Sequence, residues 1–139
     1  MQRILIGLAL LIGSLTSAYA LPEQELVARK AADQWLKLVD RGWYAESWEE
    51  TVTLFREAIS QDDWVKAMDQ VRKPLGKAEK RTLKALFYTQ SLPDAPPGSY
   101  VVVQYETQFA DRTEPALETL VPMYEEATQS WRISGYYIK

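Results

Sequence analysis

Tyr-Val-Val-Val-Gln-Tyr-Glu-Thr-Gln-Phe, residues 100–109, is the clearest β-strand pattern in this chain of 139 residues. Successive side chains of a strand point to opposite faces of the sheet, so alternate residues share a face. One face of this stretch is mainly apolar, whereas the other is polar from Gln104 to Gln108. The apolar face consists of Val101, Val103, Tyr105, Thr107 and Phe109. This alternation predicts a strand that lies with one face against a hydrophobic core.

Three further segments have a strand-like composition. Residues 81–88 precede the first pattern, and residues 116–124 and 131–138 follow it. Pro122 lacks an N–H for a ladder hydrogen bond, so we expect it at a sheet edge or at a bulge. Because sequential strands usually lie side by side, the prediction is an antiparallel meander. Turn-forming residues separate the segments at 91–98, 111–114 and 128–130.

The chain before residue 80 has a helical period instead. Apolar or small side chains recur every three or four positions in residues 22–41 and again in residues 44–59. A third helix is expected to begin at the Ser60 N-cap and to end at Pro74 and Gly76. Helices followed by strands indicate the α+β class. We predict three N-terminal helices packed on one face of a four-stranded, curved antiparallel sheet.

Residues 1–20 have the parts of a secretory signal peptide, which are a basic start, an apolar run and a small-x-small end. The apolar run is Ile4–Leu15, and Ala18 and Ala20 form the cleavage pattern. This run is shorter than the roughly 20 residues that a membrane span requires. We therefore predict cleavage after Ala20, and a single mature domain of residues 21–139 without a transmembrane span. The expected location is the periplasm or the exterior of the cell.

The composition excludes several kinds of chemistry. The chain has no cysteine and no histidine, which rules out a disulfide, a thiolate nucleophile, a Ser-His-Asp triad and the common zinc sites. A net charge of −3 argues against a nucleic-acid-binding protein, which normally carries a basic surface. Acidic pairs such as Asp62-Asp63 lack the alternating oxygen ligands of a calcium loop. We therefore expect no metal, no cofactor and no nucleic-acid partner.

Several short motifs occur together in the chain. The most specific are Tyr-Ala-Glu-Ser-Trp at residues 44–48 and Arg-x-Pro-Leu-Gly at residues 72–76. Trp-Arg-x-x-Gly-Tyr follows at residues 131–136. Together they resemble the DUF4019 family of exported bacterial domains, over residues 25–138. The resemblance implies an exported α+β domain and assigns no catalytic residue.

The order of helices and strands is also similar to the cone of the NTF2-like superfamily, in which a curved sheet wraps a long helix and can enclose a pocket. Such a fold does not set the function. An acid/base enzyme of that type needs a carboxylate in an apolar pocket and a tyrosine hydroxyl facing it. Alternation along the strand turns Glu106 away from the core. The other candidates are Asp40, Glu46 and Glu118, with the hydroxyls of Tyr44, Tyr105 and Tyr136.

The aromatic residues have two interpretations. Four of the five tryptophans lie at apolar positions of the predicted elements, namely Trp35, Trp48, Trp64 and Trp131. They either line a ligand pocket or form the core, because each ring buries about 150–250 Å². Helical spacing predicts these positions without any ligand, which favours the core.

The charged residues also have two interpretations. Arg72 and Arg81 either bind an anionic ligand, or Arg72 caps a helix end and the arginines pair with Asp40 or Glu46. Lys66 to Lys84 holds seven basic and two acidic residues, and Asp94 to Glu126 holds seven acidic and one basic. These blocks either dock a partner or pair with each other across strands. For the two arginines and for the charge blocks alike, we favour the structural interpretation. It places Lys80, Arg81 and Lys84 against Glu106 or Glu118.

The leading hypothesis is a non-enzymatic domain that binds a protein partner or a small ligand. The alternative is a small acid/base enzyme of the isomerase or dehydratase type. A ligand-binding domain is expected to have an apolar cavity of about 300 Å³ or more beside Tyr105. A protein-binding module is expected to expose an apolar patch or a sheet edge. The candidate ligand-binding residues are Tyr44, Trp48, Arg72, Arg81, Tyr105, Glu118 and Tyr136.

Overall fold

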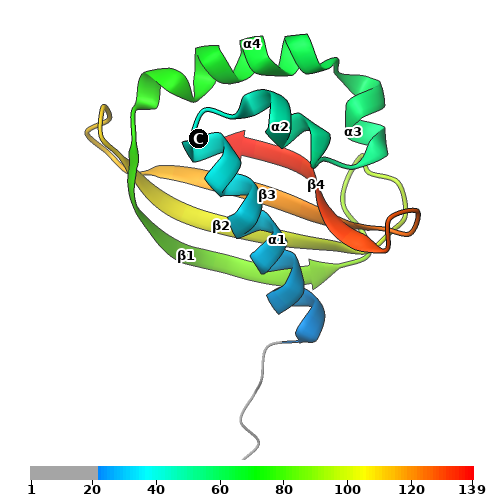
Figure 1. The fold of residues 1–139 in the computed structure, drawn as a ribbon. Coiled ribbons are helices and arrows are strands. Elements are labelled where there is room, and N and C mark those ends of the chain that lie inside the picture. The colour runs from blue at the N-terminus through cyan, green and yellow to red at the C-terminus, as the bar shows by residue number, and fades with distance from the viewer. Residues whose placement is uncertain (1–21) are drawn as a thin grey trace, which may run out of the picture.

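The computed structural model describes residues 22–139, so the predicted signal peptide lies outside the described residues. The helices come first: α1 (Glu23–Asp40), α2 (Tyr44–Glu49), α3 (Thr53–Ala58) and α4 (Gln61–Val71), followed by a short 3-10 turn, η1 (Lys73–Leu75). The strands follow: β1 (Ala78–Thr89), β2 (Tyr100–Phe109), β3 (Ala116–Glu125) and β4 (Ser130–Ile138). The predicted α+β class and the order of elements are confirmed (Figure 1).

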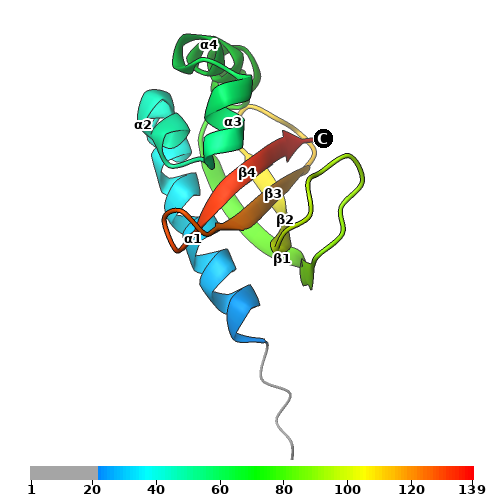
Figure 2. The same cartoon turned by 90° about the vertical axis from the view of Figure 1, so that its right-hand side faces the viewer.

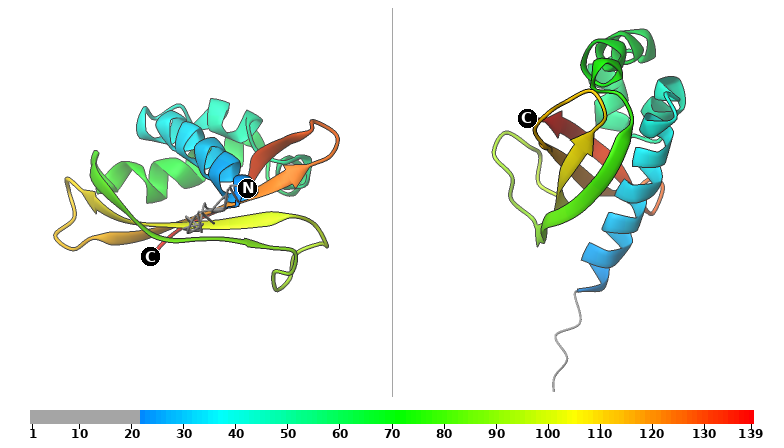
Figure 3. Two further views of the ribbon diagram at one scale, coloured as in Figure 1. Left: turned by 90° about the horizontal axis from the view of Figure 1, so that it is seen from below. Right: turned by 90° about the vertical axis from the view of Figure 1, so that its left-hand side faces the viewer.

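The four strands form one antiparallel sheet in the order β1-β2-β3-β4, as the meander prediction requires. Helices α1, α2 and α4 lie on one side of this curved sheet, with α1 across its face (Figure 2), and α3 lies beside β4. The loop between β1 and β2 lies on the other side, as a second pair of views also shows (Figure 3). The sheet therefore has a helix face and an outer face. The closer likeness to an NTF2-like cone stays a prediction.

Pro122 lies at a bulge within the sheet. It belongs to β3, an inner strand, and the pairing of β3 with β4 shifts register between Val121 and Pro122. A proline cannot donate to the ladder, and a local irregularity removes that requirement. Of the two positions that the sequence left open for Pro122, the bulge is the one observed.

The predicted second helix, residues 44–59, is divided into α2 and α3. Thr51 forms a parallel bridge with Ile133 of β4, and the Val52 N–H donates to the Ile133 carbonyl at 3.0 Å. The chain between the two helices is thus extended and satisfies part of the β4 edge. The helical spacing predicted one continuous stripe because a break of this kind is set by the neighbouring strand, which local sequence does not show.

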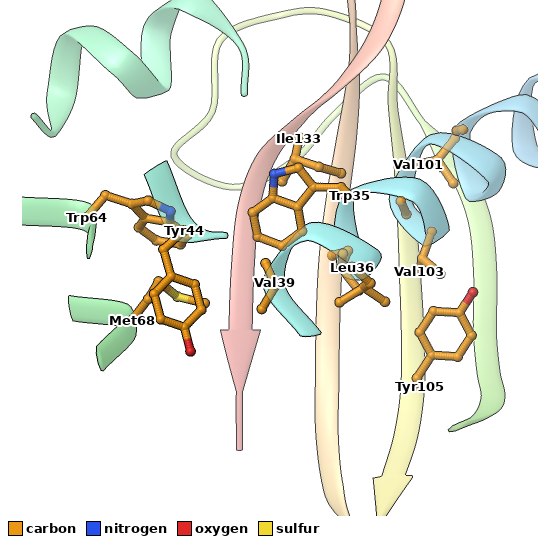
Figure 4. Packing of buried hydrophobic residues seen from close by; sticks show 13 residues of the cluster. Trp35, Leu36, Val39, Tyr44, Trp64, Met68, Val101, Val103, Tyr105 and Ile133 are labelled. Atoms are coloured by element: carbon orange, nitrogen blue, oxygen red, sulfur yellow. The ribbon is translucent and has the colours of Figure 1, made fainter. Parts of the chain in front are cut away.

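The core lies between α1 and the helix face of the sheet. One stripe of α1 is buried there, including Ala28, Trp35 and Val39, and it packs against side chains such as Val101 and Val103 (Figure 4). Trp35 lies edge-on to Tyr136, with ring centroids 5.1 Å apart. The two small alanines of α1, Ala28 and Ala32, are fully buried and so let the helix approach the strands closely. Among residues 22–139, no helix is long and apolar enough to cross a membrane.

Ser47 organises the indole rings within this core. Its hydroxyl donates to the Tyr44 carbonyl at 2.7 Å and accepts from Trp64 Nε1 at 3.0 Å. Its carbonyl accepts from Trp35 Nε1 at 2.8 Å. A third indole, Trp48, donates to the Ile59 carbonyl at 2.8 Å. Each of these ring N–H groups therefore has a partner inside the fold, and the predicted core role of these three tryptophans agrees with their contacts.

Replacing Ser47 by alanine tests this arrangement. Ser47→Ala leaves the buried Trp64 N–H without its acceptor, and an unpaired buried donor costs about 1–3 kcal/mol. We expect urea denaturation to show a loss of unfolding free energy of that size. Ser91→Ala, in the exposed loop, is the control and should change the unfolding free energy by less than about 0.5 kcal/mol. Equal losses in the two variants would contradict the assignment.

Candidate functional site

A buried carboxylate lies on the helix face, near one end of the sheet. Glu118 of β3 is fully buried, and four donors reach its two oxygens. Arg81 Nε donates to Oε1 at 2.7 Å and Arg81 Nη2 to Oε2 at 3.3 Å. The hydroxyl of Thr107 donates to Oε1, and that of Tyr136 donates to Oε2. One side chain from each of the four strands thus takes part in this cluster.

Asp40, the last residue of α1, extends the cluster to the helices. It accepts two hydrogen bonds from Arg81, Nη1 to Oδ2 at 2.6 Å and Nη2 to Oδ1 at 2.8 Å. Arg72 Nη2 also donates to Asp40 Oδ1, at 2.7 Å. Arg72 Nη1 donates to the Gly76 carbonyl at 2.8 Å, and its guanidinium lies 4.5 Å from the Phe109 ring centroid. We call Tyr136, Glu118, Thr107, Arg81, Asp40 and Arg72 the ionic network.

Charges alternate along the ionic network, and the pKa values respond to this order. Burial alone would raise the pKa of Asp40, but hydrogen bonds and charge from Arg81 and Arg72 hold it below its ordinary value. Burial would lower the pKa of Arg81, but Asp40 and Glu118 raise it well above its ordinary value. Burial, followed by the charge and hydrogen bond of Glu118, raises the pKa of Tyr136 well above 10. The phenol is therefore neutral and acts as a donor.

The geometry limits what the ionic network can do chemically. A general base needs a free lone pair within reach of a substrate proton. The oxygens of Glu118 already accept from Arg81, Thr107 and Tyr136 inside a fully buried site. Asp40 is a weak base, because its pKa is lowered. The network is suited to holding α1 and the strands in register.

Tyr105 of β2 forms a separate cluster with two residues of α1. Its hydroxyl donates to Asp33 Oδ1 and accepts from Arg29 Nε at 3.2 Å. Burial, together with the hydrogen bond to Asp33, raises the pKa of Tyr105 to about 12. Tyr44 packs in the core beside Trp64. Of the predicted ligand-binding residues, four join the ionic network, while Tyr44, Trp48 and Tyr105 lie elsewhere.

The outer face of the sheet has an apolar cleft of about 650 Å³. Val101 and Val103 point to the helix face, so Val102 points outward by alternation. We call this apolar space the outer cleft. Its floor comes from the strands, one wall comes from α3 and the residue before it, and the other wall comes from the β1–β2 loop. The floor consists of Tyr100, Val102, Thr119, Val121, Met123, Ser134, Gly135 and Tyr137, and the walls consist of Val52, Leu54, Phe55, Ala58 and Leu92–Pro96.

The β1–β2 loop is fixed above this cleft by three hydrogen bonds. The Tyr100 hydroxyl donates to the Pro96 carbonyl at 2.6 Å. The hydroxyls of Tyr88 and Ser99 form a hydrogen bond of 3.1 Å, and the Ser99 carbonyl accepts from the Tyr124 N–H at 2.9 Å. Several prolines further restrict the loop. The wall is therefore held in place before any ligand binds.

A family model described as a protein of unknown function, DUF4019, matches residues 31–136, which is more than half of the chain. The chain belongs to the DUF4019 family. No curated protein and no solved structure gives a significant match. The family resemblance in the sequence motifs is thereby confirmed, and within the motif at residues 72–76 Arg72 of the ionic network donates to the Gly76 carbonyl.

The cleft of this DUF4019 domain does not lie where the sequence placed a cavity. Tyr105 points to the helix face, and the outer cleft opens on the opposite face. No predicted ligand-binding residue lines it. The signal for it was the run Val101-Val102-Val103, because consecutive buried apolar residues indicate a strand covered on both faces. The alternating pattern from Gln104 onward concealed that signal.

Two of the three basic residues that were predicted to pair across strands do so. Lys84 Nζ lies 3.6 Å from Glu106 Oε2 of the neighbouring β2, and Arg81 reaches past β2 to Glu118 of β3. Lys80 has no ion pair among residues 22–139. Of the two carboxylates expected near the arginines, Asp40 contacts both, and Glu46 has no ion pair among residues 22–139. In the same part of the chain, no cluster of three or more acidic residues is arranged to hold a metal ion.

Glu118→Gln tests whether the ionic network stabilises the DUF4019 domain. The amide cannot accept from all the donors that surround it, and breaking a buried ion pair costs about 3–5 kcal/mol. We expect a loss of that size in urea denaturation. Glu106→Gln is the matched control on the neighbouring strand. Its pair with Lys84 is half-exposed and contributes less than about 1 kcal/mol, so similar losses for both variants would refute a central role for Glu118.

Tyr136→Phe tests the raised pKa. In the unfolded chain the phenol ionises near pH 10, whereas folding raises its pKa well above that value. The contribution of this phenol to the free energy of unfolding is therefore fully present below pH 10 and is lost as the pH rises further. Above about pH 10, the unfolding free energy of the variant should therefore fall less steeply with pH than that of the wild type. The difference in slope should be at most about 1.4 kcal/mol per pH unit. Urea denaturation at several pH values measures the slope. The exposed Tyr137→Phe is the control, and an unchanged slope in Tyr136→Phe would contradict the assignment.

Proposed function

We propose that this DUF4019 domain is a non-catalytic binding domain that holds a small apolar ligand in the outer cleft. The observation that carries the proposal is the cleft itself. Its volume of about 650 Å³ lies within the range of about 300–1,000 Å³ that is typical of small-molecule sites. Leu54 and Tyr137 remain 52% and 63% exposed at its edge. Large apolar side chains left in solvent beside a hollow are typical of a binding site.

The proposed place of action is the periplasm or the cell exterior. This part of the proposal rests on the pattern of residues 1–20, in which a basic start, an apolar run and Ala18-x-Ala20 follow one another. A binding domain released from the membrane by cleavage after Ala20 meets its ligand in water. An apolar ligand gains from leaving water, which supplies the driving force for binding.

The alternative, an acid/base enzyme, has less support. It requires a carboxylate that faces both a cavity and a tyrosine hydroxyl. Glu118 has the hydroxyl of Tyr136 within reach, but it is fully buried and occupied by other donors. The outer cleft has one carboxylate, Asp94, which is exposed. These observations favour binding over proton transfer.

The binding of an uncharged fluorescent probe, N-phenyl-1-naphthylamine, tests the proposal. Ala58 is an exposed residue of the α3 wall, so Ala58→Phe fills the outer cleft without disturbing a packed contact. We expect the wild-type domain to enhance the probe's fluorescence, and Ala58→Phe to raise its dissociation constant about tenfold or more, equivalent to about 1.4 kcal/mol.

Ala127→Phe is the matched control, because Ala127 is exposed in the β3–β4 turn and does not line the cleft. It should bind the probe as the wild type does, and both variants should unfold at the wild-type temperature. The proposal fails if the wild-type domain binds no probe, or if Ala58→Phe and Ala127→Phe bind it equally well.

A further inference from the structure

The polar groups of the outer cleft differ from those of a site for fatty acids or phosphates. We infer that the cleft takes an amphiphile with a protonated amine as its head group, and that it discriminates against anionic amphiphiles of the same chain length. This inference rests on the proposed function, since it names the class of ligand for the same cleft. Three features of the lining carry it: the sign of its charge, the direction of its hydrogen bonds and its exposed aromatic ring.

The charge at the cleft is negative. Asp94 is the one charged residue in the lining, and no lysine or arginine lies there. Its carboxylate is exposed at the rim and takes part in no ion pair within residues 22–139. The backbone of Asp94 has a φ of +61°, a left-handed conformation that aspartate and asparagine tolerate better than most residues. The loop thus holds an acidic group at the mouth of an apolar space.

Two hydroxyl groups of the cleft, those of Tyr100 and Ser134, can act toward a ligand only as acceptors, because their protons are already engaged. Tyr100 donates its hydroxyl proton to the Pro96 carbonyl, and Ser134 donates its own to the Val121 carbonyl at 2.7 Å. The Thr119 hydroxyl oxygen accepts from Gln104 Nε2 at 3.1 Å and keeps its own proton as a donor. The loop prolines, including Pro93, have no backbone N–H to offer. A carboxylate or phosphate needs donors, whereas an ammonium group is itself a donor and needs acceptors.

The body of the ligand would lie on apolar side chains. Val102, Val121 and Met123 form the floor, and Leu54 and Leu92 belong to the two walls. Tyr137 leaves most of its ring exposed at the edge, and an aromatic face attracts a nearby cation. A Cβ at Gly135 would meet that ring at 3.0 Å, so this glycine lets Tyr137 lie over the strand. A hydrocarbon chain with a cationic end matches this arrangement.

Displacement of N-phenyl-1-naphthylamine by three ten-carbon probes tests the inference: decylammonium, 1-decanol and decanoate, each below its micelle concentration at pH 7. We expect decylammonium to bind up to about fivefold more tightly than 1-decanol, because one exposed ion pair contributes at most about that factor. Decanoate should bind more weakly than 1-decanol. The preference should shrink as salt rises, because salt screens exposed charges.

Asp94→Asn removes the charge and keeps both the shape and the tolerance for positive φ. It should lower the affinity for decylammonium toward that for 1-decanol and leave the affinity for 1-decanol unchanged. Asp62→Asn is the matched control, because Asp62 is an exposed aspartate of α4 that does not line the cleft. This variant should keep the wild-type order of affinities.

The failure of this inference is distinguishable from that of the proposed function. If 1-decanol binds and Ala58→Phe blocks it, while decanoate binds as tightly as decylammonium, the cleft binds ligands but the charge preference is wrong. An unchanged preference in Asp94→Asn also overturns the inference. If none of the three probes binds the wild-type domain, both proposals fail.

Discussion

The buried ion pair between Arg81 and Glu118 is the constraint on which the rest of the structure depends. A carboxylate removed from water is stable only when donors surround it, and Glu118 obtains them from β1, β2 and β4. Arg81 must in turn be neutralised, and Asp40 at the end of α1 does this. The register of the sheet, the end of α1 and the turn after α4, where Arg72 reaches Asp40, are therefore set together.

The two faces of the sheet have different tasks. The helix face is closed by α1 and by the rings of Trp35, Trp48 and Trp64, whose N–H groups donate to Ser47 and to the Ile59 carbonyl. The outer face has no such cover, because α1, α2 and α4 pack on the opposite side of the sheet. The β1–β2 loop and α3 enclose only part of it, and the outer cleft lies between them. The closed face contributes the buried core, and the partly covered outer face is the one at which we propose binding.

The residues that suggested chemistry and those that line the cleft are different sets. Arg72, Arg81 and Glu118 suggested a ligand or a reaction because charged side chains at semi-buried positions often serve function, and the structure brings them together as partners of one another. The cleft instead uses Val102 and Val121, residue types that sequence reasoning assigns to a core. In a domain without cysteine or histidine, uncovered apolar side chains are a better indication of a candidate site than the charged residues are.

The sequence by itself determined the α+β class, the strand at residues 100–109, the meander and the family, because hydrophobic period and turn residues act locally and DUF4019 motifs are short. It also predicted that Lys80, Arg81 and Lys84 would pair with Glu106 or Glu118, and Arg81 and Lys84 do so, whereas Lys80 has no ion pair among residues 22–139. Only the tertiary structure decided the break between α2 and α3, which depends on Ile133 of β4, and the position of the cleft. Both result from contacts between segments far apart in the chain, and no local pattern records which face of a strand a distant helix or loop leaves uncovered.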